Sequence, residues 1–245
     1  MKGIILAAGR GSRMGVLTKD QPKCRTILHG KELIQWQLDA LHDSSIQNIA
    51  IVRGYLSETF DFDVTYFENN RWVETNMVMS LFAAKDWLEC YTCVTSYSDI
   101  VYSADAVSRL IDADGDIVIT YDPKWKELWG KRFKDPLSDA ETFKLEGNRV
   151  IEIGQNSSSV DEIEGQYMGL VKYTPAGWSE VSNYLKQLSQ VEVDKLDMTK
   201  LLQNLIKNDV VINAVSIQDK WFEVDSESDL NVYRTEEPII ESFYD

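Results

Sequence analysis

Short apolar runs alternate with amphipathic segments along this 245-residue chain, and this alternation limits the fold more than any other feature. The strand-like runs are 3–8, 48–55, 64–69, 91–102, 116–122, 165–174, 211–217 and 221–225, and the helix-like segments are 33–41, 77–87, 104–113, 176–188 and 198–207. Strands that alternate with helices are typical of a largely parallel sheet with crossover helices. We therefore predict an α/β fold.

The number of domains can be judged from the segments that interrupt this alternation of strands and helices. No segment is rich enough in proline, glycine or serine to act as a linker, and no repeat of fixed period is present. Hydrophobic residues make up 44% of the chain, which is enough for a sizeable core. The region 122–170 contains a polar, tryptophan-rich stretch, a hairpin-like pair of runs at 141–146 and 149–154, and a loop. We predict a single domain over 1–245, with a substrate-facing insertion or lid around 122–170.

The first predicted strand leads into LAAGRGSRMG, and we call residues 8–15 the Gly-rich turn. Gly9 and Gly11 allow positive φ and let main-chain N–H groups approach a ligand closely. Successive N–H groups in such a turn form an anion-binding concavity. Arg13 adds a forked donor that suits phosphate, and Lys23 adds a point charge. The pattern favours a polyphosphate ligand over a glycine-rich connection without one.

Two familiar phosphate-binding motifs do not fit this turn. A P-loop requires GxxxxGK[ST], and no Gly-Lys-Ser/Thr occurs here. The dinucleotide fingerprint requires GxGxxG, whereas Gly9, Gly11 and Gly15 are spaced GxGxxxG. The acidic residue expected about 20 positions further on is Asp39, which lies inside an amphipathic helix. The sequence therefore argues against a dehydrogenase.

LAAGRGSRMG, followed by Thr18 and by Pro22-Lys23, strongly resembles the nucleotidyltransferase motif of the sugar-phosphate nucleotidylyltransferases. The next segment, GKELIQWQLDAL, is similar to a helix of that family, with Glu32 in place of the usual proline. The resemblance implies a three-layer α/β sandwich with a mixed, mostly parallel central sheet. It also implies that the chain is a nucleotidyltransferase and that it acts on a nucleoside triphosphate.

The resemblance also implies roles for individual residues. Arg13 and Lys23 are expected to be catalytic, with Arg13 on the β- and γ-phosphates and Lys23 around the reacting centre. The residues expected to bind the nucleotide are Leu6, Ala7, Ala8, Gly9, Gly11, Ser12, Arg13, Lys23, Asn76 and Ser80. The charges of Arg13 and Lys23 fit these roles independently of the resemblance.

Two aspartates are candidates for holding Mg²⁺. Nucleotidyl transfer depends on positioning and on neutralising charge, so a metal-binding carboxylate is expected. Asp99 ends a predicted central strand in SYSDIVY, where ligands of open α/β sheets bind. Asp225, in WFEVDSESDL, follows a strand and precedes a helix that Ser226 could cap. Both resemble the metal-binding aspartates of the family, although position alone would favour a helix-cap or turn role for Asp225.

The segment DADGD (112–116) is a competing metal candidate. It matches the DxD of metal-dependent glycosyltransferases, and it opens like an EF-hand loop. The twelfth position from Asp112 is Pro123 rather than glutamate, which argues against an EF-hand. The segment follows a helix and precedes a strand, so we favour a C-terminal turn.

The stretch 68–84 departs from the sugar-specific enzymes, which carry a Gly-Leu-Ala/Gly segment there that faces the base and the sugar. Asn76 and Ser80 in this stretch resemble those of phosphocholine and 2-aminoethylphosphonate cytidylyltransferases, and WKELWGKRFKDPLSDAETF and GQYMGLVKYT extend the likeness. The resemblance is to a bacterial subgroup that makes CDP-linked small phospho-compounds, including phosphoglutamine, for cell-surface polysaccharides. It implies CTP and a small phosphorylated acceptor as the substrates.

The chemistry of the variable segments agrees with an acceptor that bears an amine. Aromatic faces with nearby carboxylates suit ammonium groups, and a basic residue could hold the acceptor phosphate. The residues expected to bind the acceptor are Trp129, Lys131, Arg132, Asp139, Glu141 and Tyr167. Simple packing is the alternative role for the aromatic members.

We therefore expect transfer of CMP from CTP to a phosphorylated acceptor such as phosphoglutamine, phosphocholine or 2-aminoethylphosphonate. Pyrophosphate is released, and Mg²⁺ assists. The alternatives are a sugar-1-phosphate nucleotidylyltransferase that uses another NTP, and a non-catalytic nucleotide sensor. No Ser-His-Asp or Cys-His set is needed, because the reaction requires no covalent enzyme intermediate.

The net charge and the number of cysteines limit which partners and which cellular compartment we expect. The net charge is −15, which argues against nucleic acid and anionic membranes, yet residues 1–24 hold five cations and one acid. No apolar run is long enough to span a bilayer. Three cysteines do not form a disulfide framework, and we expect Cys90 and Cys93 to be buried structural thiols. We expect a cytoplasmic protein and allow for a homodimer.

Overall fold

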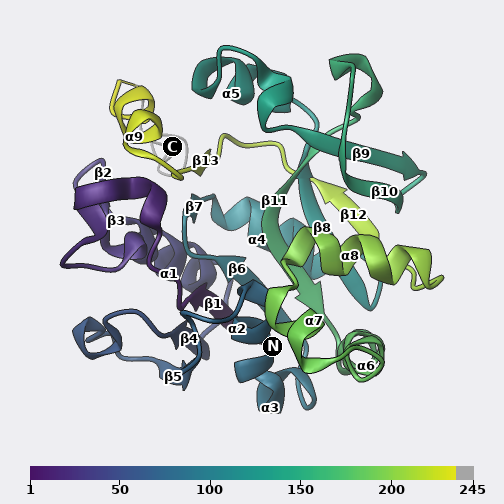
Figure 1. Ribbon diagram of the computed structural model, residues 1–245, viewed down its shortest axis with the longest axis horizontal. Coiled ribbons are helices and arrows are strands. Elements are labelled where there is room, and N and C mark those ends of the chain that lie inside the picture. The colour runs from purple at the N-terminus through teal and green to yellow at the C-terminus, as the bar shows by residue number, and fades with distance from the viewer. Residues whose placement is uncertain (236–245) are drawn as a thin grey trace.

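A nine-stranded sheet forms the centre of the computed structural model, which describes residues 1–235 (Figure 1). The strands are β1 (Lys2–Ala7), β2 (Ile27–Leu28), β3 (Lys31–Glu32), β4 (Ile49–Arg53), β5 (Thr65–Glu68), β6 (Cys93–Tyr97), β7 (Ile100–Val101), β8 (Ile117–Asp122), β9 (Glu141–Glu146), β10 (Arg149–Asn156), β11 (Gln166–Tyr173), β12 (Asn213–Ser216) and β13 (Phe222–Glu223). The helices are α1 (Leu33–Asp43), α2 (Met77–Ala83), α3 (Lys85–Leu88), α4 (Ala104–Asp112), α5 (Trp125–Arg132), α6 (Pro175–Leu185), α7 (Gln190–Lys195), α8 (Met198–Lys207) and α9 (Glu227–Tyr233).

The sheet is mixed and mostly parallel. Its order is β5-β4-β1-β6-β11-β8-β12-β10-β9, and β11 and β10 run opposite to the other strands. Helices flank it: α1 packs against α4, whereas α2 packs against α7 and α8 (Figure 1). The expected α/β architecture is confirmed. The single domain expected over 1–245 stays a prediction, and its last residues, 236–245, lie outside the described part.

The sequence of β1, KGIILA, explains its central place. A continuous apolar run suits a strand that is covered on both faces, and Ile4 and Ile5 are completely buried. Ile5 pairs with Ile51 of β4 on one side and with Ser96 of β6 on the other, both in parallel. The carboxyl ends of these strands therefore share one edge of the sheet. The chain leaves β1 into the Gly-rich turn at this edge.

Helix α5 lies in the polar, tryptophan-rich stretch of region 122–170, where no helix was among the expected segments. Trp125 and Trp129 are its buried residues, and they lie four positions apart on one face. The centroids of their rings lie 6.0 Å apart, and the Trp129 ring also packs against Trp221. Only three residues of this polar octapeptide are apolar, Trp125, Leu128 and Trp129, which is too few to predict a helix from the sequence, so tertiary packing determines it.

Several smaller expectations have mixed outcomes. The run 91–102 divides into β6 and β7, and the helix expected over 77–87 breaks at Ala84. Cys93 is buried as expected, but Cys90 precedes the strand and is exposed, so its prediction as a buried thiol was wrong. The DADGD segment ends α4 and turns toward β8, as expected. Within residues 1–235, the helices are all too short or too polar to cross a membrane.

Candidate active site

Lys23, Asp99 and Asp225 meet at the carboxyl edge of the sheet. The Lys23 Nζ atom lies 2.7 Å from Asp99 Oδ2 and 2.7 Å from Asp225 Oδ1. Arg13 Nη1 donates to Asp225 Oδ2 at 3.1 Å. Lys23 is almost fully buried, whereas the Arg13 side chain is 72% exposed and faces solvent. The structure thus brings the expected catalytic pair and the expected metal pair into one cluster.

A small second sheet brings the two aspartates together. Strand β13 pairs antiparallel with β7, so that Glu223 lies opposite Ile100. The Val224 N–H also donates to the Asp99 carbonyl at 2.8 Å. An apolar cluster beneath this sheet joins it to the Gly-rich turn and to α9; its buried members are Met14, Leu28, Leu33, Val101, Phe222, Val224, Leu230 and Tyr233. This packing fixes the geometry of the site.

Gly11 makes room for the Lys23 side chain. Its φ is +68°, and a Cβ at this position would lie 2.6 Å from the Cβ and Cδ atoms of Lys23. Thr18 Oγ1 donates to the Gly11 carbonyl at 3.1 Å and closes the turn. A larger residue would be strained and would also displace Lys23. Gly11 is therefore required for the position of the Lys23 side chain, in addition to any contact with a bound phosphate.

Electrostatic coupling keeps this cluster charged. Burial acts to lower the pKa of Lys23, but the charges of Asp99 and Asp225 outweigh it and raise the pKa above its ordinary value. Burial acts to raise the pKa of Asp225, but Lys23 and Arg13 hold it below its ordinary value. Lys23 therefore remains an ammonium and Asp225 a carboxylate at neutral pH.

The donor set suits a hard divalent cation. Asp99 Oδ1 is buried and makes no hydrogen bond within the described part of the chain, and Asp225 lies beside it. Mg²⁺ commonly takes one or two carboxylates and completes its shell with phosphates and water. Residues 1–235 hold no group of three or more acidic, histidine or cysteine ligands. A site here would therefore depend on oxygens from the substrates.

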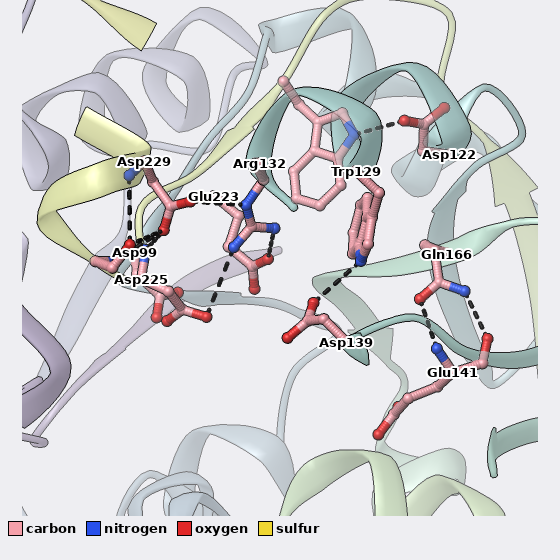
Figure 2. Close-up of polar contacts among 12 residues, drawn as sticks. Asp99, Asp122, Trp129, Arg132, Asp139, Glu141, Gln166, Glu223, Asp225 and Asp229 are labelled. Atoms are coloured by element: carbon pink, nitrogen blue, oxygen red, sulfur yellow. Dashed lines mark hydrogen bonds and ion pairs between the residues drawn. The ribbon is translucent and has the colours of Figure 1, made fainter. Parts of the chain in front are cut away.

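Arg132 lies behind this cluster, next to Glu223 and Asp229 (Figure 2). Its side chain is 0% exposed, Nε donates to Asp229 Oδ1 at 3.1 Å, and Nη1 donates to Glu223. Burial, with Asp225 and Asp99 nearby, raises the pKa of Glu223 to about 7, although Arg132 opposes the shift. Arg132 is thus enclosed by carboxylates rather than open to the acceptor phosphate expected for it.

A cavity of about 250 Å³ adjoins the cluster. Arg13, Glu223 and Asp225 line one part of it. Four of the expected acceptor-binding residues also line it: Trp129, Asp139, Glu141 and Tyr167. Lys131 lines a different cavity, of about 230 Å³, on another side of α5. The structure therefore places the expected aromatic and acidic residues together in one cavity. Neither Lys131 nor Arg132 lines this cavity, although the Arg132 guanidinium packs over the Trp129 ring, 5.3 Å from its centroid.

Inside this cavity the Asp139 carboxylate and the main chain of Glu141 are held in place. Trp129 Nε1 donates to Asp139 Oδ2 at 3.0 Å, and Gln166 binds the main chain of Glu141 in both directions (Figure 2). Burial, together with Asp197 and Asp139, raises the pKa of Glu141 above its ordinary value. Negative charge in a confined cavity favours a cationic ligand group.

Asn76 and Ser80, which were expected to bind the nucleotide, make structural contacts at the start of α2. Asn76 caps α2 by accepting from the Met77 N–H at 2.8 Å. Ser80 is buried and accepts from Asn69 Nδ2 at 3.1 Å. Sequence reasoning missed Asn69, and it also missed Glu223. Glu223 ends β13 and lies two positions before Asp225, and this Glu-x-Asp spacing beside a candidate metal ligand is the signal that points to Glu223.

Comparison with known proteins identifies the family. A model of the MobA-like NTP transferase domain matches residues 3–163, which is more than half of the chain. The chain belongs to the MobA-like NTP transferase family. The matched range contains the Gly-rich turn, Lys23 and Asp99, whereas Asp225 lies beyond it. The expected nucleotidyltransferase membership is confirmed.

Within this family, the chain is similar to characterised cytidylyltransferases. It is 40% identical to the CTP:phosphoglutamine cytidylyltransferase of Campylobacter jejuni, over 95% of this chain and 98% of that protein. It is also 34% identical to the 2-aminoethylphosphonate cytidylyltransferase of Lancefieldella rimae, over 42% of this chain and 45% of that protein. The expected similarity to this cytidylyltransferase subgroup is confirmed.

Solved structures support the fold of this NTP transferase. The inositol-1-phosphate CTP transferase from T. maritima superposes with a TM-score of 0.74 at 19% identity, covering 98% of this chain and 96% of that one. The CTP:phosphocholine cytidylyltransferase from Streptococcus pneumoniae gives 0.69 at 21% identity, covering 95% and 97%. At these identities the likeness concerns the architecture alone.

Proposed function

We propose that the protein transfers CMP from CTP to a small phosphorylated acceptor that carries an amine, and releases pyrophosphate. The cavity beside the Lys23 cluster is the observation that carries this proposal. Arg13 stands at one part of its lining, and Asp139 and Glu141 stand at another. A phosphorylated amine has one anionic and one cationic end, which suits such a lining. The 40% identical CTP:phosphoglutamine cytidylyltransferase adds independent support.

In the proposed reaction, an oxygen of the acceptor phosphate attacks the α-phosphorus of CTP. A new P–O bond forms as the bond to the pyrophosphate oxygen breaks, and that electron pair leaves with pyrophosphate. Lys23 stabilises the negative charge that develops on the α-phosphate, and Arg13 steadies the departing pyrophosphate. The amides of the Gly-rich turn hold the triphosphate.

Asp99 and Asp225 are the residues that would hold Mg²⁺ in this reaction. The cation would supply neutralisation of the triphosphate charge when bound. The Oδ1 atom of Asp99, buried without a hydrogen bond in the described part of the chain, and the lowered pKa of Asp225 support this assignment.

Three further expectations belong to this proposal. We place the reaction in the cytoplasm, where CTP is made, with products that serve cell-surface polysaccharide synthesis. The chain is proposed to act without nucleic acid or membrane partners, which its net charge of −15 supports. A homodimer is also compatible with the proposed reaction.

Pyrophosphate release with each of the four NTPs tests the function. The acceptors are phosphoglutamine, phosphocholine, 2-aminoethylphosphonate and glucose 1-phosphate. We expect turnover with CTP and at least one amine-bearing acceptor. Preference for glucose 1-phosphate with another NTP would replace the proposal with a sugar nucleotidylyltransferase. CTP binding without turnover on any acceptor would indicate a nucleotide sensor instead.

A further inference from the structure

The segment that follows β5 borders the Gly-rich turn, and we call residues 69–76 the nucleoside-side loop. Trp72 in this loop packs on Gly54, where an added Cβ would lie 2.8 Å from Trp72 Cβ and 2.9 Å from the Ala8 carbonyl oxygen. The ring centroids of Tyr55 and Trp72 lie 5.2 Å apart, and the main-chain N–H of Tyr55 donates to the Ala8 carbonyl at 2.9 Å. The loop therefore abuts the turn that is proposed to hold the triphosphate.

Asp194 of α7 holds both ends of residues 71–76. Its two carboxylate oxygens accept from Arg71, Nη1 to Oδ1 at 3.1 Å and Nη2 to Oδ2. Its main-chain carbonyl accepts from the Asn76 N–H at 2.7 Å. Gln190 Nε2 donates to Asp194 Oδ1 at 2.7 Å and orients the carboxylate. One residue, 123 positions away from Arg71, thus fixes this stretch of chain.

The loop has internal bonds that do not involve Asp194. Asn69 Nδ2 donates to Thr75 Oγ1 and to Ser80 Oγ, each at 3.1 Å. Thr75 Oγ1 donates to the Arg71 carbonyl at 2.9 Å. These bonds set the shape of the loop. Asp194 holds it against α7, while Trp72 on Gly54 and the Asn69 N–H, which donates to the Arg53 carbonyl at 2.9 Å, hold it at its other side. Loss of the carboxylate should therefore move the loop without unfolding it.

We propose that Asp194 is a positioning residue for CTP, because its bidentate pair with Arg71 fixes the nucleoside-side loop beside the Gly-rich turn. This inference rests on the proposed function. Two parallel charge-assisted bonds restrict direction as well as distance. A loop that is fixed before binding spares the ligand the cost of ordering it. Asp194 lies outside the range 3–163 that the family model matches. The carboxyl-terminal third of the chain therefore helps to hold the nucleoside-side loop in place.

Asp194→Ala and Arg71→Ala test the proposal through steady-state kinetics. We expect each variant to raise the KM for CTP about threefold to tenfold, the range expected for one well-formed ion pair near the surface. We expect kcat and the KM for the acceptor to stay within about twofold, since neither residue lines the acceptor cavity. The KM for CTP of the double variant should lie well below the product of the two single effects, because both substitutions remove the same pair.

Asp161→Ala is the matched control, because it removes an exposed ion pair with Lys126 at 3.0 Å elsewhere on the molecule. This variant should leave the KM for CTP unchanged. An unchanged KM for CTP in Asp194→Ala would overturn the inference, and so would an equal rise in both KM values with a fall in kcat. A double variant whose effect is the product of the singles would also overturn it.

Hydrogen exchange separates this inference from the proposed function. In Asp194→Ala, the amides of 71–76 should exchange faster than in the wild-type protein, while those of β1 should not change. If the wild-type protein shows no turnover, the proposed function fails. The exchange rates of the amides of 71–76 then still test whether Asp194 holds the loop. Unchanged exchange in these amides would overturn that role.

Discussion

The ammonium of Lys23 lies between carboxylates that are 76 and 202 positions away in the sequence. Such an arrangement costs free energy through burial and recovers it through paired charge. It is useful where a strong local field must act on a substrate that is itself highly charged. In this protein the arrangement places a fixed positive charge next to the proposed reacting phosphorus.

Replacing Lys23 with alanine should lower kcat by about 10²–10³, the usual cost of losing one electrostatic donor to a transition state. Initial rates of pyrophosphate release measure this. Lys126→Ala, at a half-exposed surface position, serves as the control and should retain full activity. Circular dichroism shows whether each variant is folded. Turnover near the wild-type rate in folded Lys23→Ala would remove Lys23 from catalysis.

Glu141 gives a prediction about pH. Its pKa is raised by burial and by Asp197 and Asp139, so it becomes protonated at a higher pH than an ordinary glutamate. Protonation removes the charge that is proposed to bind the acceptor amine. The KM for an amine-bearing acceptor should therefore rise as pH falls through the raised pKa of Glu141, by at most about tenfold per pH unit.

Glu141→Gln controls for titration of the acceptor itself. The ratio of acceptor KM between the wild-type protein and Glu141→Gln should approach a constant as pH falls, because both side chains are then neutral. A ratio that is constant across the whole pH range would exclude a charged role for Glu141.

Sequence reasoning singled out residues that belong to clear local patterns and missed contacts that depend on distant partners. Arg13 and Lys23 belong to a continuous motif, and Asp99 follows a clear strand. Arg132 looked available for phosphate, but its partners Glu223 and Asp229 are more than 90 positions away. Nothing in the local sequence around Arg132 indicates that its side chain is buried.

At the scale of elements, Gly11 shows how the turn and the lysine depend on each other. Gly11→Ala places a side chain at φ +68° and within 2.6 Å of Lys23. Positive φ costs about 1–3 kcal/mol in the folded state, and overpacking adds a similar amount. We expect a loss of about 2–5 kcal/mol in the free energy of unfolding, measured by urea denaturation.

Gly130→Ala is the control for this substitution. Gly130 lies in α5, and a methyl group added there would meet no atom of the described chain within 4 Å apart from its chain neighbours and the backbone of its own helix. Alanine is the better helix former, so stability should stay equal or rise by up to about 1 kcal/mol. A Gly11→Ala protein as stable as Gly130→Ala would contradict the close packing of Lys23 against the turn.

The predictability of each element followed the strength of its local pattern. Strand β1 and helix α8 carry long apolar patterns, and their expected ranges agree with the structure. Helix α5 has two buried apolar residues among eight, and α7 has six residues in all. The contacts that stabilise α5 involve Trp221, far along the chain, so the local sequence does not indicate them.

For the molecule as a whole, the charge distribution matters more than the net charge of −15. Cations cluster in the first 24 residues, and the structure places Arg13 and Lys23 of that segment beside Asp99 and Asp225. The result is a site of mixed sign within an acidic protein. Such a site suits a triphosphate that arrives with a divalent cation.

The proposed chemistry requires that an acceptor phosphate attacks the α-phosphorus of CTP at this site. An acceptor phosphate labelled with ¹⁸O on its terminal oxygens tests this step directly, with the products separated and analysed by mass spectrometry. We predict that the label stays in the CDP-linked product, including its bridging oxygen, and that pyrophosphate carries none. Label in pyrophosphate, or the absence of a CDP-linked product, would contradict the proposed reaction.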